Sequence, residues 1–293
     1  MEKKFNSNRF QGKKKISFSK DKSKFEDREK NFDGRQKASS KSEDSAPKAN
    51  EKIRLNRFIA NAGICSRREA DTLISEGVVE LNGEICTELG TKVSFSDTVK
   101  VNGKRIEGEK KKYLLLNKPK DYITTMDDEK GRKTVLDLVD RACPERIYPV
   151  GRLDRATTGL LLFTNDGQMT KKLTHPSSNI KKIYQVALDK NMTQKDMVRL
   201  VEGVELEDVT VTVDKAMYAR EGQDKKVVTL ELHSGKNRVI RRMMETLGYK
   251  VSRLDRVQFA GLTKKDIPRG RFRFLTEKEI GFLHKITGIK QQS

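Results

Sequence analysis

The sequence predicts an α+β protein: a small module of two helices and short strands, then a larger body built on a mixed, mainly antiparallel sheet with flanking helices. Two short segments carry apolar residues at helical spacing, and two Asn-Gly turns between β-rich runs follow them, which defines the module. In the body, strand and helix candidates do not alternate as they would in a doubly wound sheet. We expect three segments along the chain, at residues 1–52, 53–106 and 111–288.

The first segment, residues 1–52, is predicted to be a disordered basic tail. It is rich in Lys, Ser, Asn, Asp and Glu, contains no Val or Leu, and its isolated phenylalanines follow neither a helical nor a strand period. Such a composition buries too little apolar surface to offset the chain entropy that folding removes. Two roles stay open: a solvated tail that keeps the protein soluble, or a basic arm that holds RNA and stacks bases on its phenylalanines.

The module begins with a helix in RLNRFIANAG, where apolar residues recur at helical spacing from Leu55 to Ala62 and Gly63 is the expected C-cap. Ser66 and Glu69 then have the spacing of a capping box, which starts a second helix. VVELNGEI and TVKVNGKRI are predicted as short strands with Asn-Gly turns. Arginines on or beside the two helices favour contact with phosphates over a merely solvated helix face. These are Arg54, Arg57, Arg67 and Arg68.

The body contains strand and helix candidates of ordinary length. Strands are predicted at Tyr113–Leu116, Leu160–Thr164, Tyr184–Leu188, Val209–Ala216 and Val227–Leu232. Helices are predicted at Thr134–Val139, Gln168–Leu173, Gln194–Val201, Val239–Leu247 and Glu277–Ile280. Lys118-Pro119 ends the first strand, because proline cannot continue it. Asp166 in TNDGQ is expected to be a structural N-cap of the helix that follows.

Charge narrows the class of partner. The 293 residues include 62 Lys and Arg against 42 Asp and Glu, a net charge of +20. A surplus of this size favours polyanions, nucleic acid first and an anionic membrane surface second. No segment approaches the roughly 18 apolar residues of a membrane span, and the N-terminus lacks the apolar part of a secretory signal. We therefore expect a cytoplasmic protein, and nothing in the sequence demands more than a monomer.

Metal, disulfide and nucleotide chemistry are not expected. The three cysteines, Cys65, Cys86 and Cys143, are widely spaced and form no C-x-x-C pair, which argues against disulfides. The three histidines do not lie at metal-ligand spacing to one another or to a cysteine, so we expect no zinc site. No Walker or dinucleotide-binding motif occurs, and no cofactor is predicted.

The segment YPVGRLDRATTGLLLFTNDG carries the best candidate for chemistry. Asp154 lies between Arg152 and Arg155, whose charges would keep its carboxylate ionised, and Gly151 allows a backbone conformation that other residues avoid. An ionised aspartate on a loop next to a rigid strand suits a nucleophile or a base. From these residues alone, a structural Asp-Arg pair is the more common outcome, and both interpretations stay open.

Two resemblances extend this prediction. Residues 54–103, RLNRFIANAGICSRREADTLISEGVVELNG through TVKVNG, resemble an S4 domain, a small RNA-binding module found in ribosomal protein S4 and several RNA-modifying enzymes. The GRLDRATTG segment is similar to the signature of ribosomal RNA pseudouridine synthases that carry such a domain. KKIYQV, GKNRVIRRMMETLGYKV, LNKPKDYITT, LTHPS and VSRLDRVQFAGL are also similar to segments of that family and stand in its order. The resemblance spans residues 53–280.

The resemblance implies roles for single residues. Asp154 would be the catalytic aspartate, Tyr184 would contact the target base, and Arg241 would pair with the aspartate. Arg152 would occupy the space that a flipped-out base leaves, or hold its phosphate. We also expect Lys236 and Arg242, in the same basic segment as Arg241, to contact RNA.

The resemblance implies isomerisation of uridine to pseudouridine in ribosomal RNA, without a cofactor. GICSRREAD and the intact GRLDRATTG favour the large ribosomal subunit as substrate, with the small subunit as the alternative. Two other functions stay open: a non-catalytic RNA-binding factor in ribosome assembly, and hydrolysis of an N-glycosidic bond by a carboxylate pair.

Overall fold

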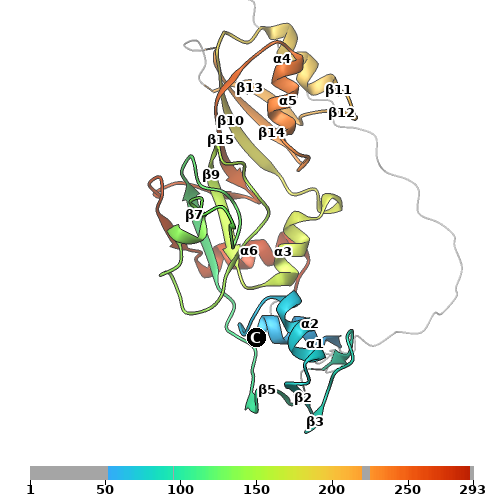
Figure 1. The fold of residues 1–293 in the computed structure, drawn as a ribbon. Coiled ribbons are helices and arrows are strands. Elements are labelled where there is room, and N and C mark those ends of the chain that lie inside the picture. Colours follow the sequence, from blue (N-terminus) through green and yellow to red (C-terminus); the bar gives the residue numbers. More distant parts are fainter. Residues whose placement is uncertain (1–51, 95, 220–224, 291–293) are drawn as a thin grey trace, which may run out of the picture. The chain divides into compact units, whose positions relative to one another are not determined.

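The computed structural model describes residues 52–290, apart from residue 95 and residues 220–224 (Figure 1). The predicted tail, except Lys52, lies outside the described residues. We refer below to the N-terminal module, residues 53–106, and to the body that follows it.

The N-terminal module contains the two predicted helices, α1 (Leu55–Asn61) and α2 (Arg67–Ser75), which pack against each other. The capping box of α2 is confirmed: the Ser66 backbone amide donates to the Glu69 carboxylate, and the Glu69 amide donates to the Ser66 hydroxyl. Gly63 follows α1 with φ of +74°, a conformation that costs a glycine little.

Short strands complete the module. They are β1 (Ile53–Arg54), β2 (Val79–Leu81), β3 (Glu84–Ile85), β4 (Lys92–Val93), β5 (Val99–Val101) and β6 (Lys104–Arg105). β1 pairs with β4, and the others form a sheet in the order β3-β2-β5-β6. Both Asn-Gly pairs have positive φ at both residues, as a tight hairpin between twisted strands requires. The predicted hairpins are confirmed.

The body is built on one sheet of nine strands within the described residues. Its strands are β7 (Tyr113–Lys118), β8 (Tyr148–Pro149), β9 (Thr157–Thr164), β10 (Lys182–Leu188), β13 (Lys215–Tyr218), β14 (Val227–Leu232), β15 (Val251–Phe259), β16 (Leu262–Thr263) and β17 (Phe272–Phe274). Seven of them follow the order β13-β14-β10-β15-β9-β7-β17, while β8 pairs with β9 and β16 with β15. β9 and β15 are parallel and the other pairs are antiparallel, so the predicted mixed, mainly antiparallel sheet is confirmed.

Helices and a small hairpin flank this sheet. They are α3 (Gly167–Thr174), α4 (Gln194–Glu202), α5 (Val239–Thr246), α6 (Glu277–Thr287) and the hairpin of β11 (Val204–Leu206) with β12 (Val209–Val211). α3 and α6 contact each other beside the β7 and β9 end of the sheet (Figure 1). Asp166 caps α3 as predicted, since its carboxylate accepts the amides of Gln168 at 2.9 Å and Met169 at 3.1 Å.

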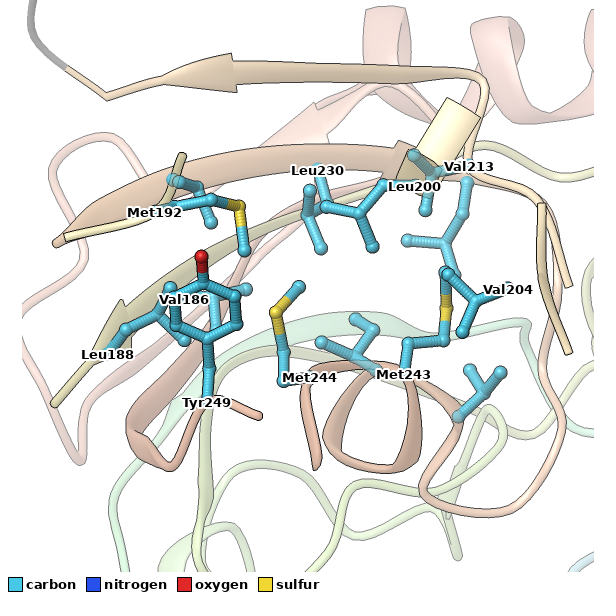
Figure 2. Close-up of a cluster of buried hydrophobic side chains, with 14 of the residues drawn as sticks. Val186, Leu188, Met192, Leu200, Val204, Val213, Leu230, Met243, Met244 and Tyr249 are labelled. Atoms are coloured by element: carbon cyan, nitrogen blue, oxygen red, sulfur yellow. The ribbon is translucent and has the colours of Figure 1, made fainter. Parts of the chain in front are cut away.

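Two apolar clusters matter for the site. The first packs α4 and α5 onto β10 and β14, and Figure 2 shows Met243 and Met244 of α5 within it, among side chains that include Val186 and Leu230. The second gathers the buried residues Leu114 and Leu116 of β7 with other side chains from β9 and the loops beside it. The full second set is Leu114, Leu116, Val135, Val139, Ile147, Leu153, Leu161 and Phe163.

Several predicted elements differ from the structure. The strand predicted at Val209–Ala216 is divided between β12 and β13, and a 3-10 turn at Leu136–Leu138 replaces the helix predicted at Thr134–Val139. α6 is longer than predicted. The central strand β15 was not predicted at all, because its middle holds two buried charged residues, Asp255 and Arg256, in place of an apolar run.

Candidate active site

Asp154 lies on the loop that leads into β9, and its neighbours fix the loop backbone. Gly151 has φ of +73°, and Leu153 is buried in the second apolar cluster. The Thr124 hydroxyl donates to the Leu153 carbonyl at 2.8 Å, and the Leu153 amide donates back to that hydroxyl at 3.2 Å. The Asp154 carboxylate itself, half-buried, has no hydrogen-bond or ion-pair partner among the described residues. The loop therefore presents a carboxylate that is fixed through its backbone and free at its oxygens.

Lys118, at the end of β7, makes hydrogen bonds to the backbone of the same loop. Its side chain is 0% exposed. Its ammonium lies within hydrogen-bond distance of four backbone carbonyls, those of Pro119 (3.1 Å), Asp154 (3.2 Å), Arg155 (3.4 Å) and Thr157 (2.9 Å), so at least one of its three N–H donors is shared. Burial lowers the pKa of Lys118 to about 8, and the nearby negative charges of Asp154 and Asp121 oppose that shift. Sequence reasoning missed this residue, although a lysine that ends an apolar strand is a usable signal.

The two arginines beside Asp154 differ in their contacts. The Arg155 guanidinium lies 3.3 Å from the Asp121 carboxylate, and the Asp121 amide donates to the Arg155 carbonyl at 2.9 Å. Arg152 is exposed and has no ion pair among the described residues. Arg155 therefore forms its ion pair with Asp121 and not with Asp154, and the expected effect of the two arginines on the Asp154 carboxylate stays a prediction.

Tyr184 lies between the two apolar clusters. It is half-buried on β10 and packs against side chains of both clusters. Its Cα partners are Leu230 on β14 and Arg256 on β15, and a bulge interrupts the β10–β15 pairing between Ile183 and Tyr184. Because Leu153 belongs to the second cluster, Tyr184 and the Asp154 loop border the same apolar region.

Arg241 projects from α5 and is half-buried. One guanidinium nitrogen, Nη1, donates to the Val251 carbonyl at 3.4 Å, while Nε is buried without a partner among the described residues. Burial lowers the pKa of Arg241, Arg238 adds to that effect, and the negative charge of Asp154 opposes it. Arg241 and Asp154 thus act on each other electrostatically, but no ion pair or bidentate contact joins them in the described structure.

The remaining predicted RNA-binding residues lie apart from this loop in the chain. Arg54, Arg67, Arg68 and Lys236 are exposed, and Arg57 is half-buried. Arg242 forms an ion pair with Asp208, so its charge is already partnered.

Among the described residues, no group of three or more His, Cys, Asp or Glu side chains could hold a metal ion. Within the same part of the chain, no helix has the length and apolar character needed to cross a membrane.

Lys118→Met is expected to lower the free energy of unfolding by about 2–3 kcal/mol, because buried carbonyls lose a charged donor. Urea unfolding measures the change. Lys120→Met is the matched control, since Lys120 is exposed two residues further on and should change stability by less than about 0.5 kcal/mol. Equal stability of the two variants would show that the four bonds of Lys118 contribute nothing to the fold.

Comparison with known proteins identifies both parts of the chain. The family model described as RNA pseudouridylate synthase matches residues 112–246, and the S4 domain model matches residues 53–99. Ribosomal large subunit pseudouridine synthase B of Bacillus subtilis is 44% identical over 78% of this chain and 93% of its own length. The dual-specificity RNA pseudouridine synthase RluF of Escherichia coli is 37% identical over 80% of this chain and 79% of its own length.

A solved structure agrees with these relatives. The crystal structure of a pseudouridylate synthase superposes with a TM-score of 0.57 at 29% identity, and covers 79% of this chain and 99% of that chain. The Bacillus subtilis relative exceeds 40% identity along nearly its whole length, and the two family models match both the N-terminal module and the body of this chain. The chain therefore belongs to the RNA pseudouridine synthase family and is an RNA pseudouridine synthase with an S4 domain in front of its synthase domain.

Proposed function

We propose that this enzyme converts one or more uridines of ribosomal RNA, those of the large subunit in the first place, to pseudouridine, with Asp154 as the catalytic carboxylate. The observation that carries the proposal is the Asp154 carboxylate itself: its loop is fixed by Lys118 and Thr124, and its oxygens have no partner among the described residues. Relatives named for the large ribosomal subunit support the choice of substrate.

The reaction needs only groups that this site offers. The bond from ribose C1′ to uracil N1 breaks, the base turns, and a bond from C1′ to uracil C5 forms, while the C5 proton leaves and N1 takes up a proton, so that the product is an isomer of the substrate. A carboxylate can attack C6 of the uracil or C1′ of the ribose, or assist a glycal-type intermediate. Arg241 orients and balances the charge of Asp154 when RNA closes the site, and its buried Nε supplies a free donor. Tyr184 places an aromatic face beside the uracil, with its hydroxyl near the departing proton.

The target base must leave its stack before it reacts, at a cost of a few kcal/mol. Arg152 is exposed on the catalytic loop, where it can fill the vacated space or hold the displaced phosphate. Residues 53–106 form the S4 domain that docks RNA, residues 111–288 form the synthase domain, and residues 1–52 are a basic tail. The enzyme works in the cytoplasm as a monomer and without a cofactor.

Tritium release tests this function directly. Ribosomal RNAs transcribed with [5-³H]uridine lose tritium to water only where the base has been reattached through C5. The purified protein should release tritium from large-subunit RNA, with small-subunit RNA as the comparison. Release from the small-subunit RNA alone would move the substrate to that subunit, and release from neither RNA would overturn the proposed substrate.

Arg67 and Arg68, exposed in the first turn of α2, are expected to contact RNA phosphates. The double variant Arg67→Ala/Arg68→Ala should bind RNA more weakly. Its log–log salt dependence should be shallower by about 0.7–0.9 for each phosphate contact that is lost. Lys278→Ala/Lys285→Ala on α6 is the matched control, since it removes two exposed charges outside the S4 domain. Filter binding across a salt series measures both, and identical slopes would remove these arginines from the interface.

A further inference from the structure

The parallel pairing of β9 with β15 joins the two halves of the active site. β9 and β7 lie on the side of the sheet whose loop carries Asp154, whereas β10, β14 and β15, with α5, form the side that carries Tyr184 and Arg241. Only three Cα pairs connect β9 to β15: Thr157 with Leu254, Thr158 with Asp255, and Gly159 with Arg256. We call this pairing the seam. Figure 1 shows β9 and β15 side by side at the middle of the sheet.

Two buried side chains bond across the seam. The Arg256 Nε donates to the Leu160 carbonyl of β9 at 2.8 Å, and the Thr158 hydroxyl donates to the Leu254 carbonyl of β15 at 3.2 Å. Arg256 is 3% exposed, its guanidinium lies 4.6 Å from the centre of the Phe259 ring, and Nη2 has no partner among the described residues. Within those residues no carboxylate pairs with Arg256, so burial of its charge costs stability without an ion pair to offset it.

The two backbones also approach each other unusually closely at the seam. Gly159 has φ of +104°, and any side chain there would collide with the backbone of Arg256. Gly159 is in turn the Cα partner of Lys118, and Arg256 is the Cα partner of Tyr184. One row across four strands therefore runs from the lysine that holds the Asp154 loop, through the seam, to the tyrosine on the other side.

Asp255 adds a second connection from β15 to the Asp154 side. Its buried carboxylate lies 2.7 Å from the Lys264 ammonium and 2.9 Å from the Arg269 guanidinium. The loop that carries these two cations is bonded to β7, because the Asn117 side chain donates to the Ile267 carbonyl at 2.8 Å. The sequence Arg-Leu-Asp-Arg occurs at residues 152–155 and again at residues 253–256, and the last three residues of the second copy lie in the seam.

We propose that Arg256 and Thr158 are positioning residues that set the distance between Asp154 and the pair Tyr184 and Arg241. The inference rests on the proposed roles of those three residues. Neither Arg256 nor Thr158 needs to touch RNA; each acts by fixing β9 against β15. If β9 shifts against β15, the distance between catalytic groups on opposite sides of the seam changes. A displacement of about 1 Å can lower the reaction rate about 10²-fold.

The test compares bonds across the seam with a bond of the same kind on one side of it. Arg256→Met, Arg256→Lys and Thr158→Val remove or change bonds across the seam. Ser252→Ala is the matched control, because the Ser252 hydroxyl donates at 2.9 Å to the Ala187 carbonyl on β10, without crossing the seam. The readouts are the single-turnover rate of tritium release at saturating enzyme, the Kd for RNA, and thermal unfolding. At saturating enzyme the rate constant reports only folded molecules, so a merely structural role leaves it unchanged.

Arg256→Met is expected to lower the rate constant about 10²-fold, Arg256→Lys about 10-fold and Thr158→Val about 5-fold. The Kd for RNA should stay within about threefold for each, and Ser252→Ala should keep the wild-type rate within about twofold. If the wild-type protein is active and both Arg256→Met and Thr158→Val react at the wild-type rate, this inference is wrong and the proposed function still stands. If Arg256→Met does not fold, Arg256→Lys and Thr158→Val decide in the same way. A wild-type protein that releases no tritium would overturn the proposed function, and the inference with it.

Discussion

Asp154→Asn is expected to lower the rate of pseudouridine formation by about 10⁴-fold or more, because an amide of the same shape is neither a nucleophile nor a base. RNA binding should survive within about twofold, since the loop is held through backbone groups and not through the carboxylate. Single-turnover tritium release from labelled ribosomal RNA gives the rate, and filter binding gives the Kd.

Asp121→Asn is the matched control for this variant. Asp121 also lies near the Lys118 ammonium, but its carboxylate is paired with Arg155, and asparagine tolerates its φ of +70°. The control should keep the wild-type rate within about threefold. Substantial tritium release by Asp154→Asn, or an equal loss in both variants, would remove Asp154 from the chemistry.

Arg241→Lys is expected to lower the rate about 10²-fold, although the charge is retained. A lysine cannot reproduce the two parallel donors with which a guanidinium orients a carboxylate. It also has no nitrogen at the position of the arginine Nε. The effect should fall on the single-turnover rate constant at saturating enzyme. The Kd for RNA should change less than the rate constant, because Arg241 is half-buried and its positive charge is retained in the lysine variant.

Arg199→Lys on α4 is the control for Arg241→Lys. Arg199 is exposed and pairs with Asp196 three residues before it, so the exchange should leave the rate within about twofold. If Arg241→Lys reacts at the wild-type rate, a point charge suffices at this position and the proposed role of the guanidinium in orienting Asp154 is wrong. If it loses only RNA affinity, Arg241 is a phosphate contact.

Helix caps and tight turns were predicted correctly, because each depends on only a few neighbouring residues. The Ser66 and Glu69 capping box, the Asn-Gly hairpins and the Asp166 cap each follow from a few neighbouring residues, and each is confirmed. The mixed sheet followed from the order of the elements. The GRLDRATTG segment led to a fixed loop with a free carboxylate, although the family resemblance, and not the local charges, favoured chemistry there.

Long-range burial of charge could not be predicted in this way. Lys118 and Arg256 are both buried. Because lysine and arginine are usually exposed, the sequence pattern predicts both of them at the surface. The partner of Arg155 is Asp121, which is distant in the chain and is brought close only by the fold. Strand β15 was missed for the same reason, since its central residues are polar and buried by pairing on both sides.

Pseudouridine mapping in both ribosomal RNAs tests the central claim most directly. The comparison uses cells that lack the protein, with a plasmid that supplies either the wild-type chain or Asp154→Asn at equal level. We predict that at least one pseudouridine, in large-subunit RNA, disappears without the protein, returns with the wild-type chain and stays absent with Asp154→Asn. An unchanged map in cells without the protein, or a modification restored by Asp154→Asn, would contradict this account.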